Sequence, residues 1–227
     1  MIEAVAFDLD GVLIDSEPVW ERVRRGLVEE FGRPYPPNAT ADIMGMSAPE
    51  WSRYLHDRLG VPLEPERINA EVVRRVAAEF RRTLPLLPNA TETVRALAAR
   101  WPLAVASSSN RSLIELALQL AQIESSFRAI VSSEEVPNGK PAPDVYLRAA
   151  ALLGSEPPRC AAIEDSTNGI RSAAAARMFV VAIPNRHFPP APDALARANL
   201  VLDALGELTP QRLEAALREP PADPNRE

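Results

Sequence analysis

The chain is unusually poor in lysine. Of its 25 basic residues only Lys140, in the stretch PNGKPAPD, is a lysine, and every other one is an arginine. A compact ammonium on a flexible stem can contact two anionic oxygens together, whereas a planar guanidinium needs room for a wider fork. We therefore expect Lys140 to occupy a site that an arginine does not fit.

Cysteine is equally scarce. The one cysteine, Cys160, cannot form an internal disulfide, which favours a reducing compartment, and its apolar neighbours predict a buried, unreactive thiol. The N-terminal stretch MIEAVAFDLDG has no basic segment, and its apolar run is too short for a signal peptide or a membrane span. We expect a cytoplasmic protein.

The chain also lacks an excess of positive charge. Its net charge of -6 and pI near 5.2 argue against a nucleic-acid or anionic-membrane partner, because such surfaces require a basic field. Any phosphate that the protein binds must then be neutralised locally. The 23 prolines are about twice the usual share and stiffen loops.

Short apolar runs alternate with segments of helical periodicity over most of the chain. Such runs are typical of strands buried on both faces, and they cover residues 2–9, 102–107, 128–133, 159–164, 178–183 and 199–202. The helical segments cover residues 88–100, 110–122, 143–153, 167–177 and 209–218. This alternation predicts the α/β class, with right-handed crossovers and a doubly wound parallel sheet.

Residues 15–85 interrupt the alternation. They predict helices only, at 17–31, about 48–59 and 66–82, and the middle helix begins with Ser47 and Glu50 at capping-box spacing. We expect a core formed by residues 1–14 and 86–220, an all-helical cap at 15–85 that closes over the core, and a frayed tail at 221–227.

Polar residues follow four of the predicted strands. They are Asp8 and Asp10 after the first, Ser107, Ser108 and Ser109 at the second, Lys140 after the third, and Glu164 and Asp165 at the fourth. Gly11, directly after the first strand, is expected to allow a sharp turn of the backbone. Because ligands of such sheets collect beyond the carboxyl ends of the strands, these side chains are expected in one crevice.

These residue types fit phosphoryl transfer to an aspartate. Carboxylates can hold Mg²⁺ in its octahedral oxygen shell, and a lysine can neutralise further charge on a phosphate. A carboxylate can then attack phosphorus as a nucleophile. Asp8 and Asp10, two residues apart on a strand, are expected to face the same side, so that one attacks while the other moves protons.

The sequence resembles the haloacid dehalogenase superfamily, and within it the branch of β-phosphoglucomutase and the small sugar-phosphate phosphatases. Its four motifs are FDLDGVLIDSEPVW (7–20), VASSS (105–109), GKPAPD (139–144) and AAIEDSTNGIRSAAAA (161–176). The resemblance covers essentially the whole chain and implies a Rossmann-like core with a helical cap.

The resemblance also implies roles for the site residues. Asp8 would form an aspartyl phosphate, and Asp10 would act as general acid and then general base. Ser107, the backbone N–H of Ser108, and Lys140 would bind the phosphoryl oxygens. Mg²⁺ would be held by Asp8, the carbonyl of Asp10, and Asp165, with Glu164 as a further ligand or as a partner of the ligands.

Three departures from the mutases favour hydrolysis. Met44 and Ala48 stand where the mutases have a lysine and an arginine around a cap loop, and Trp20 stands where they have a histidine. Carbon–phosphorus cleavage through a cap lysine is excluded, because Lys140 is the sole lysine. Arg177 replaces a usual glycine at the end of a helix.

We therefore expect a Mg²⁺-dependent phosphomonoester hydrolase, a monomer, that acts on a small phosphorylated metabolite such as a sugar or polyol phosphate. The alternatives are a β-phosphoglucomutase-like phosphomutase and a non-catalytic phosphate sensor. Trp20, Met46, Trp51 and Tyr54 are candidates for the leaving-group pocket or for cap packing. The arginine pairs 24/25, 74/75 and 81/82 are expected on a solvated face, with the alternative that one of these arginines reaches a sugar phosphate when the cap closes. Asp15 and Glu17 are expected to cap or orient the hinge.

Overall fold

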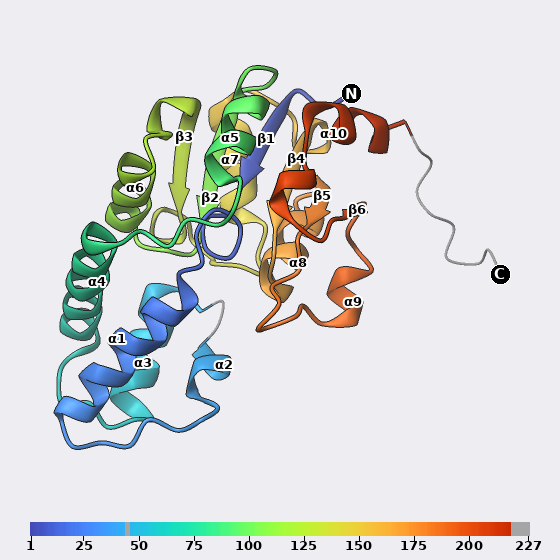
Figure 1. Ribbon diagram of the computed structural model, residues 1–227. Coiled ribbons are helices and arrows are strands. Elements are labelled where there is room, and N and C mark those ends of the chain that lie inside the picture. The colour runs from blue at the N-terminus through green and yellow to red at the C-terminus, as the bar shows by residue number, and fades with distance from the viewer. Residues whose placement is uncertain (44–45, 219–227) are drawn as a thin grey trace.

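A six-stranded parallel sheet lies at the centre of the molecule (Figure 1). This computed structural model describes residues 1–43 and 46–218. The strands are β1 (Ala4–Phe7), β2 (Leu103–Ser107), β3 (Phe127–Ser132), β4 (Cys160–Glu164), β5 (Phe179–Ala182) and β6 (Leu200–Val201), in the order β3-β2-β1-β4-β5-β6. Each strand falls within one predicted apolar run or, for β3, within one residue of it. The predicted doubly wound parallel sheet is confirmed.

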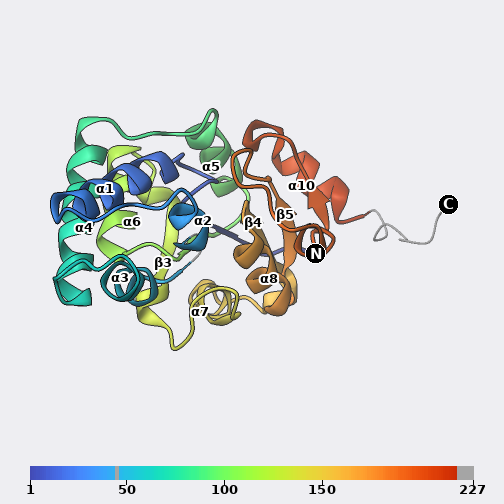
Figure 2. The same cartoon turned by 90° about the horizontal axis from the view of Figure 1, so that it is seen from below.

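Helices cover both faces of the sheet, and for this reason the central strands β1, β2 and β4 are buried along their whole length. Ala4 and Ala6 of β1 face α7 (Asp144–Leu153) and α8 (Thr167–Ala175) in one buried cluster. Val5 and Phe7 belong to a second cluster with α5 (Ala90–Ala98), α6 (Arg111–Leu120) and α10 (Pro210–Ala216). Alternate residues of a strand point to opposite faces, and Figure 2 shows the two helical layers on either side of the strands. Alanine on one face lets α7 and α8 approach the sheet closely.

The remaining elements of this part are short. They are α9 (Pro192–Leu195) and the 3-10 turns η1 (Glu124–Ser126), η2 (Ser133–Glu135), η3 (Pro157–Arg159) and η4 (Leu205–Glu207). Cys160 lies in the core as predicted, and burial raises the pKa of its thiol to about 11.

The segment between β1 and α5 is helical, as predicted. It contains α1 (Glu17–Glu30), α3 (Ala48–Asp57) and α4 (Pro65–Arg82), which group together beyond the carboxyl edge of the sheet (Figure 1). A fourth helix, α2 (Ala39–Ile43), was not predicted, because five residues are too short to show a periodicity. It is stabilised locally, since Asn38 Nδ2 donates to Asp42 Oδ2 at 2.8 Å and Ile43 is buried.

Two connecting segments join this helical segment to the sheet, and their backbones are hydrogen-bonded to each other. The backbone N–H of Asp15 donates to Pro85 O at 2.8 Å, and that of Leu87 donates to Leu13 O at 3.0 Å. Asp15 thus lies in the connection, as expected. None of the described helices has the length and apolarity that a membrane span requires. Residue 44 and the predicted frayed tail lie outside the described residues.

Candidate active site

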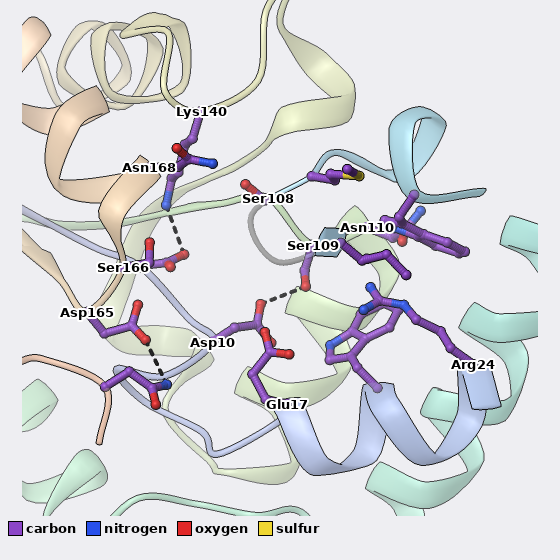
Figure 3. A pocket seen from close by; sticks show the side chains of 16 residues that line it. Asp10, Glu17, Arg24, Ser108, Ser109, Asn110, Lys140, Asp165, Ser166 and Asn168 are labelled. Carbon is purple, nitrogen blue, oxygen red and sulfur yellow. Dashed lines mark hydrogen bonds and ion pairs between the residues drawn. The ribbon is translucent and has the colours of Figure 1, made fainter. Parts of the chain in front are cut away.

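Reactive side chains from separate parts of the chain meet where the sheet reverses its order. In the strand order, β2 and β3 follow β1 toward one edge of the sheet, whereas β5 and β6 follow β4 toward the other edge. The carboxyl ends of the adjacent strands β1 and β4 therefore flank the point where the order reverses. A pocket of about 70 Å³ opens there (Figure 3). Of the seven predicted site residues, five line it: Asp8, Asp10, Ser108, Lys140 and Asp165. Ser107 and Glu164 are fully buried, with no exposed surface.

Lys140 bridges two carboxylates. Its Nζ lies 2.6 Å from Oε1 of Glu164 and 3.1 Å from Oδ1 of Asp8, and its side chain is 3% exposed. Burial by itself lowers the pKa of Lys140, but the two neighbouring carboxylates outweigh it and raise that pKa above its usual value. Lys140 is therefore charged, and its side chain is buried at the wall of the pocket.

Asp8, Glu164 and Asp165 form a buried acidic cluster. Each offers an oxygen within 4.8 Å of the others. Burial raises the pKa of Asp8 to about 7 and that of Asp165 well above its usual value, and the mutual repulsion of the carboxylates adds to both shifts. Among the described residues, the buried Oδ1 of Asp8 accepts no well-aligned hydrogen bond, and its one cationic neighbour is Nζ of Lys140 at 3.1 Å. The cluster offers only carboxylate oxygens as ligands, and its negative charge is not fully neutralised by the protein. Such a site fits a hard cation such as Mg²⁺.

Glu164 differs from the other two acids because its oxygens are already occupied. Its Oε1 accepts hydrogen bonds from Lys140 Nζ and from Tyr146 Oη, both at 2.6 Å. Its Oε2 accepts from the backbone N–H of Asp165 at 3.2 Å and from Ser166 Oγ at 3.3 Å. This carboxylate holds the groups around it in place.

Asp10 is held by hydroxyl groups. Ser16 Oγ donates to Oδ1 of Asp10, while Ser109 Oγ at 2.6 Å and Ser107 Oγ at 3.4 Å donate to Oδ2. Ser107 Oγ also accepts from the backbone N–H of Ser109 at 3.0 Å. Ser107 and Ser108 were predicted from the sequence to contact the phosphoryl group, but the hydrogen bond from Ser109 to Asp10 was not predicted. The run of three serines was the available signal, since all three follow the same strand.

Two glycines allow the acidic groups to approach the backbone. Gly11 has a φ of +78°, which agrees with the sharp turn expected there, and a Cβ on it would lie 1.9 Å from Oδ2 of Asp165. A Cβ on Gly169 would lie 1.9 Å from Oε2 of Glu164. Any side chain at either position would displace a carboxylate.

The far half of the pocket comes from the helical segment. It includes Glu17, Trp20 and Arg24 of α1, Met46, and Trp51 of α3. Trp20, Met46 and Trp51 were candidates for this wall, and all three line it. Tyr54 is absent from the described lining, and its hydroxyl donates instead to Asp42 at 2.9 Å.

One expectation for α1 was wrong. Arg24 is not on a solvated face: it is 7% exposed, and Trp20 and Trp51 cover it. Glu17, the first residue of α1 after the connection, also lines the pocket. Helical periodicity was the available signal for Arg24, because it stands four residues after Trp20 and three before Leu27, on the buried face of the helix. The neighbouring Arg25 does follow expectation, with its side chain 40% exposed and paired to Glu21.

The fold and the pocket together define an α/β enzyme whose reactive side chains follow the strands of a doubly wound sheet. The chain belongs to the haloacid dehalogenase-like hydrolases, because the model of that family matches residues 2–177. It is 36% identical over 224 residues to hexitol phosphatase B of Escherichia coli O157:H7, covering 93% of this chain and 96% of the relative. It is 30% identical over 180 residues to a fructose-1-phosphate phosphatase of Escherichia coli K12, covering 77% and 93%.

A solved structure shows the same fold. The β-phosphoglucomutase of Clostridium difficile superimposes with a TM-score of 0.81 at 25% identity, covering 95% of this chain and 97% of the other. The resemblance inferred from the four motifs is therefore confirmed, and both the phosphatases and the mutase of that branch are among the similar proteins.

Proposed function

We propose that the protein is a Mg²⁺-dependent phosphatase that hydrolyses sugar or polyol phosphates through an aspartyl phosphate on Asp8. The observation that carries the proposal is the position of Asp8 Oδ1. It is buried, accepts no well-aligned hydrogen bond from the described residues, and lies 3.1 Å from Lys140 Nζ beside two further acids. Similarity to phosphatases of hexitol and fructose 1-phosphates supports the substrate class.

Asp8 would attack phosphorus while the bond between phosphorus and the leaving oxygen breaks. Asp10, oriented by Ser16 and Ser109, would give its proton to that oxygen. Water would then attack the aspartyl phosphate, Asp10 would take the water's proton, and the carboxylate of Asp8 would be released together with inorganic phosphate. Lys140 would offset the charge that develops on the phosphoryl oxygens.

Asp8, Asp165 and the carbonyl of Asp10 are the ligands that we assign to Mg²⁺. The ion would supply positive charge to the phosphoryl oxygens and so reduce their repulsion of a carboxylate nucleophile. Glu164 would act by orienting Lys140 rather than as a ligand, because four donors already occupy its oxygens. Ser107 and the N–H of Ser108 would contact the phosphoryl group.

Residues 15–85 would form a cap and residues 1–14 and 86–220 the core. The paired connections at Asp15 and Leu87 are suited to a hinge, and closing the cap would exclude water from the reaction. We also expect a cytoplasmic monomer with no nucleic-acid partner. Sedimentation would test the oligomeric state.

Release of inorganic phosphate from p-nitrophenyl phosphate tests the activity. We expect turnover with Mg²⁺, loss of turnover with EDTA, and loss of at least 1,000-fold in Asp8→Asn and Asp10→Asn. Asp57→Asn, on the exposed side of α3, is the matched control and should retain full activity. A well-folded wild-type protein that is inactive with Mg²⁺ would support the phosphate sensor instead.

A hexose 1-phosphate separates the phosphatase from the phosphomutase. The phosphatase releases inorganic phosphate, whereas a mutase accumulates the 6-phosphate isomer. Trp20, in place of the histidine that the mutases carry, lines the pocket and favours the first outcome. Of the other two departures, Ala48 is buried at the start of α3, and Met44 lies outside the described residues.

A further inference from the structure

The far half of the pocket contains a buried arginine, Arg24, that has no hydrogen-bond partner among the described residues. Arg24 is 7% exposed, its Nε is buried, and no hydrogen bond to a described residue occupies its guanidinium. Its Cζ lies 4.7 Å from the ring centre of Trp20 and 4.9 Å from that of Trp51. Stacking on two indoles stabilises the cation without consuming its N–H groups. Nε of Arg24 therefore has a hydrogen to donate and no partner among the described residues.

Glu17 stands beside Arg24 on the same helix, and both reach into the pocket (Figure 3). No ion pair joins them among the described residues, yet the charge of each affects the other. Burial raises the pKa of Glu17 and Arg24 opposes that rise, while burial lowers the pKa of Arg24 and Glu17 opposes that fall. The two side chains thus place one acceptor group and one donor group of opposite charge in the same part of the pocket.

Asn110, from the sheet side of the pocket, offers an acceptor. Its Nδ2 donates to Glu134 Oε1 at 2.6 Å and to Asn69 Oδ1 at 3.3 Å, which determines the orientation of the amide. Its Oδ1 is buried and has no partner among the described residues. Apart from Oδ1 of Asp8 in the acidic cluster, the described lining therefore has one unpaired buried donor, Nε of Arg24, and one unpaired buried acceptor, Oδ1 of Asn110.

A hydroxyl group satisfies both kinds of unpaired atom, because it donates one hydrogen bond and accepts others. A second anionic group satisfies only the donor, and it would meet the charge of Glu17. Lys140 and Arg24 are the only cations in the described lining, and Lys140 lies at the opposite end with Asp8. The rings of Trp20 and Trp51 offer apolar surface to a carbon chain.

We propose that Arg24, Glu17 and Asn110 form a binding site for the hydroxyl groups of the leaving alcohol, and that this site selects uncharged polyhydroxylated phosphates over those carrying a second anion. This inference rests on the proposed function and narrows its substrate class. Arg24 and Glu17 determine the specificity, because the charge of each offsets that of the other. Removing the charge of Arg24 or that of Glu17 should therefore change the preference between substrates, and the expected change differs between the two variants.

Three phosphates test this selection. Sorbitol 6-phosphate and 6-phosphogluconate have the same stereochemistry and differ at C1, which is an alcohol in the first and a carboxylate in the second. Hexyl phosphate has no hydroxyl groups. We expect the wild-type kcat/KM for sorbitol 6-phosphate to exceed that for each of the others by about 10- to 100-fold, the effect of hydrogen bonds to charged groups.

The variants have opposite expected effects. Arg24→Met should bring the kcat/KM ratio of sorbitol 6-phosphate to hexyl phosphate close to one. Glu17→Gln leaves the positive charge of Arg24 unbalanced, so it should raise kcat/KM for 6-phosphogluconate relative to sorbitol 6-phosphate by about 10-fold. Arg25→Met, one residue along the helix and paired to Glu21, is the matched control and should leave all three ratios unchanged. If Arg24→Met does not fold, Glu17→Gln alone tests the charge balance.

Three outcomes would overturn the inference: a wild-type preference for 6-phosphogluconate, an equal loss on sorbitol 6-phosphate and hexyl phosphate in Arg24→Met, or an unchanged preference in Glu17→Gln. Failure of the proposed function looks different. In that case the wild-type protein would release no phosphate even from p-nitrophenyl phosphate, and the hydroxyl site would fail with it.

Discussion

Nζ of Lys140 lies 2.6 Å from Oε1 of Glu164, and the two side chains are 3% and 0% exposed. This buried pair also contacts Asp8 and Tyr146. The enclosure accounts for the single lysine of the chain, because a guanidinium would need more room than the space between two carboxylates provides.

The pair predicts a specific pattern of stabilities. Lys140→Met leaves Glu164 as an uncompensated buried charge, so it should lower the free energy of unfolding by about 3 kcal/mol. The double variant Lys140→Met, Glu164→Gln removes both charges and should be more stable than Lys140→Met alone. Urea titrations of the wild type, both single variants and the double variant measure the coupling. Additive effects would show that the two side chains do not interact.

Lys140→Arg keeps the charge and changes the shape. We expect it to lower the free energy of unfolding by about 2 kcal/mol through overpacking and to lower kcat for p-nitrophenyl phosphate by more than about 100-fold, the scale of losing one electrostatic contact in the transition state. The control is Arg25→Lys, the reverse exchange at an exposed position. It should change neither the free energy of unfolding nor kcat. An active Lys140→Arg variant would contradict the steric explanation.

Asp8 predicts a pH dependence of stability in the metal-free protein. Its pKa is about 7 in the fold, chiefly because of burial, against 3.8 in the unfolded chain. Between these values the unfolded chain loses the proton and the folded chain keeps it, so stability falls as the pH rises from about 4 to 7. Asp8→Asn removes this penalty and, in EDTA, should be more stable than the wild type by about 2 kcal/mol at pH 8 but not at pH 4.

Thermal unfolding of both proteins in EDTA across this range measures the effect. Adding Mg²⁺ at pH 8 should raise the melting temperature of the wild type and reduce the advantage of Asp8→Asn, because the ion binds the ionised carboxylate. A wild type that is more stable than Asp8→Asn at every pH would show that Asp8 has mainly a structural role.

Replacing two helical glycines, Gly169 and Gly26, with alanine should have opposite effects on the stability of the protein. Gly169→Ala places a methyl group on Glu164, and we expect a loss of about 2 kcal/mol together with reduced phosphate release. Gly26→Ala, in α1, meets nothing within 4 Å, so it should stabilise the protein by about 0.5–1 kcal/mol. Equal effects at the two positions in chemical denaturation would contradict the close approach at Gly169.

Arg177 replaces a glycine at the end of α8 and has a left-handed backbone, with a φ of 62°. We expect Arg177→Gly to stabilise the protein by about 0.5–1 kcal/mol, because glycine adopts this conformation without a steric cost. Arg177→Ala keeps the unfavourable φ and separates the backbone effect from loss of the exposed side chain. Should both variants gain equally in urea titrations, the side chain rather than the backbone is responsible.

The sequence by itself determined the sheet and the edge at which Asp8, Lys140 and Asp165 meet. Apolar runs and helical periodicity are local properties, and parallel strands bring their carboxyl ends to one edge regardless of the loops between them. The sole lysine was informative for the same reason, since only a buried, crowded site explains why arginine is avoided there.

Only the tertiary structure decided what surrounds those groups. The environment of Arg24 depends on where α3 places Trp51, and Asn110 is free to accept a hydrogen bond only because Glu134 and Asn69 hold its amide. Arg24 and Arg25 are neighbours with the same side chain, yet one is buried in the pocket and the other is exposed. Helical periodicity places Arg24 on the apolar face of α1 with Trp20 and Leu27, but its position between two indoles depends on the packing of α1 against α3.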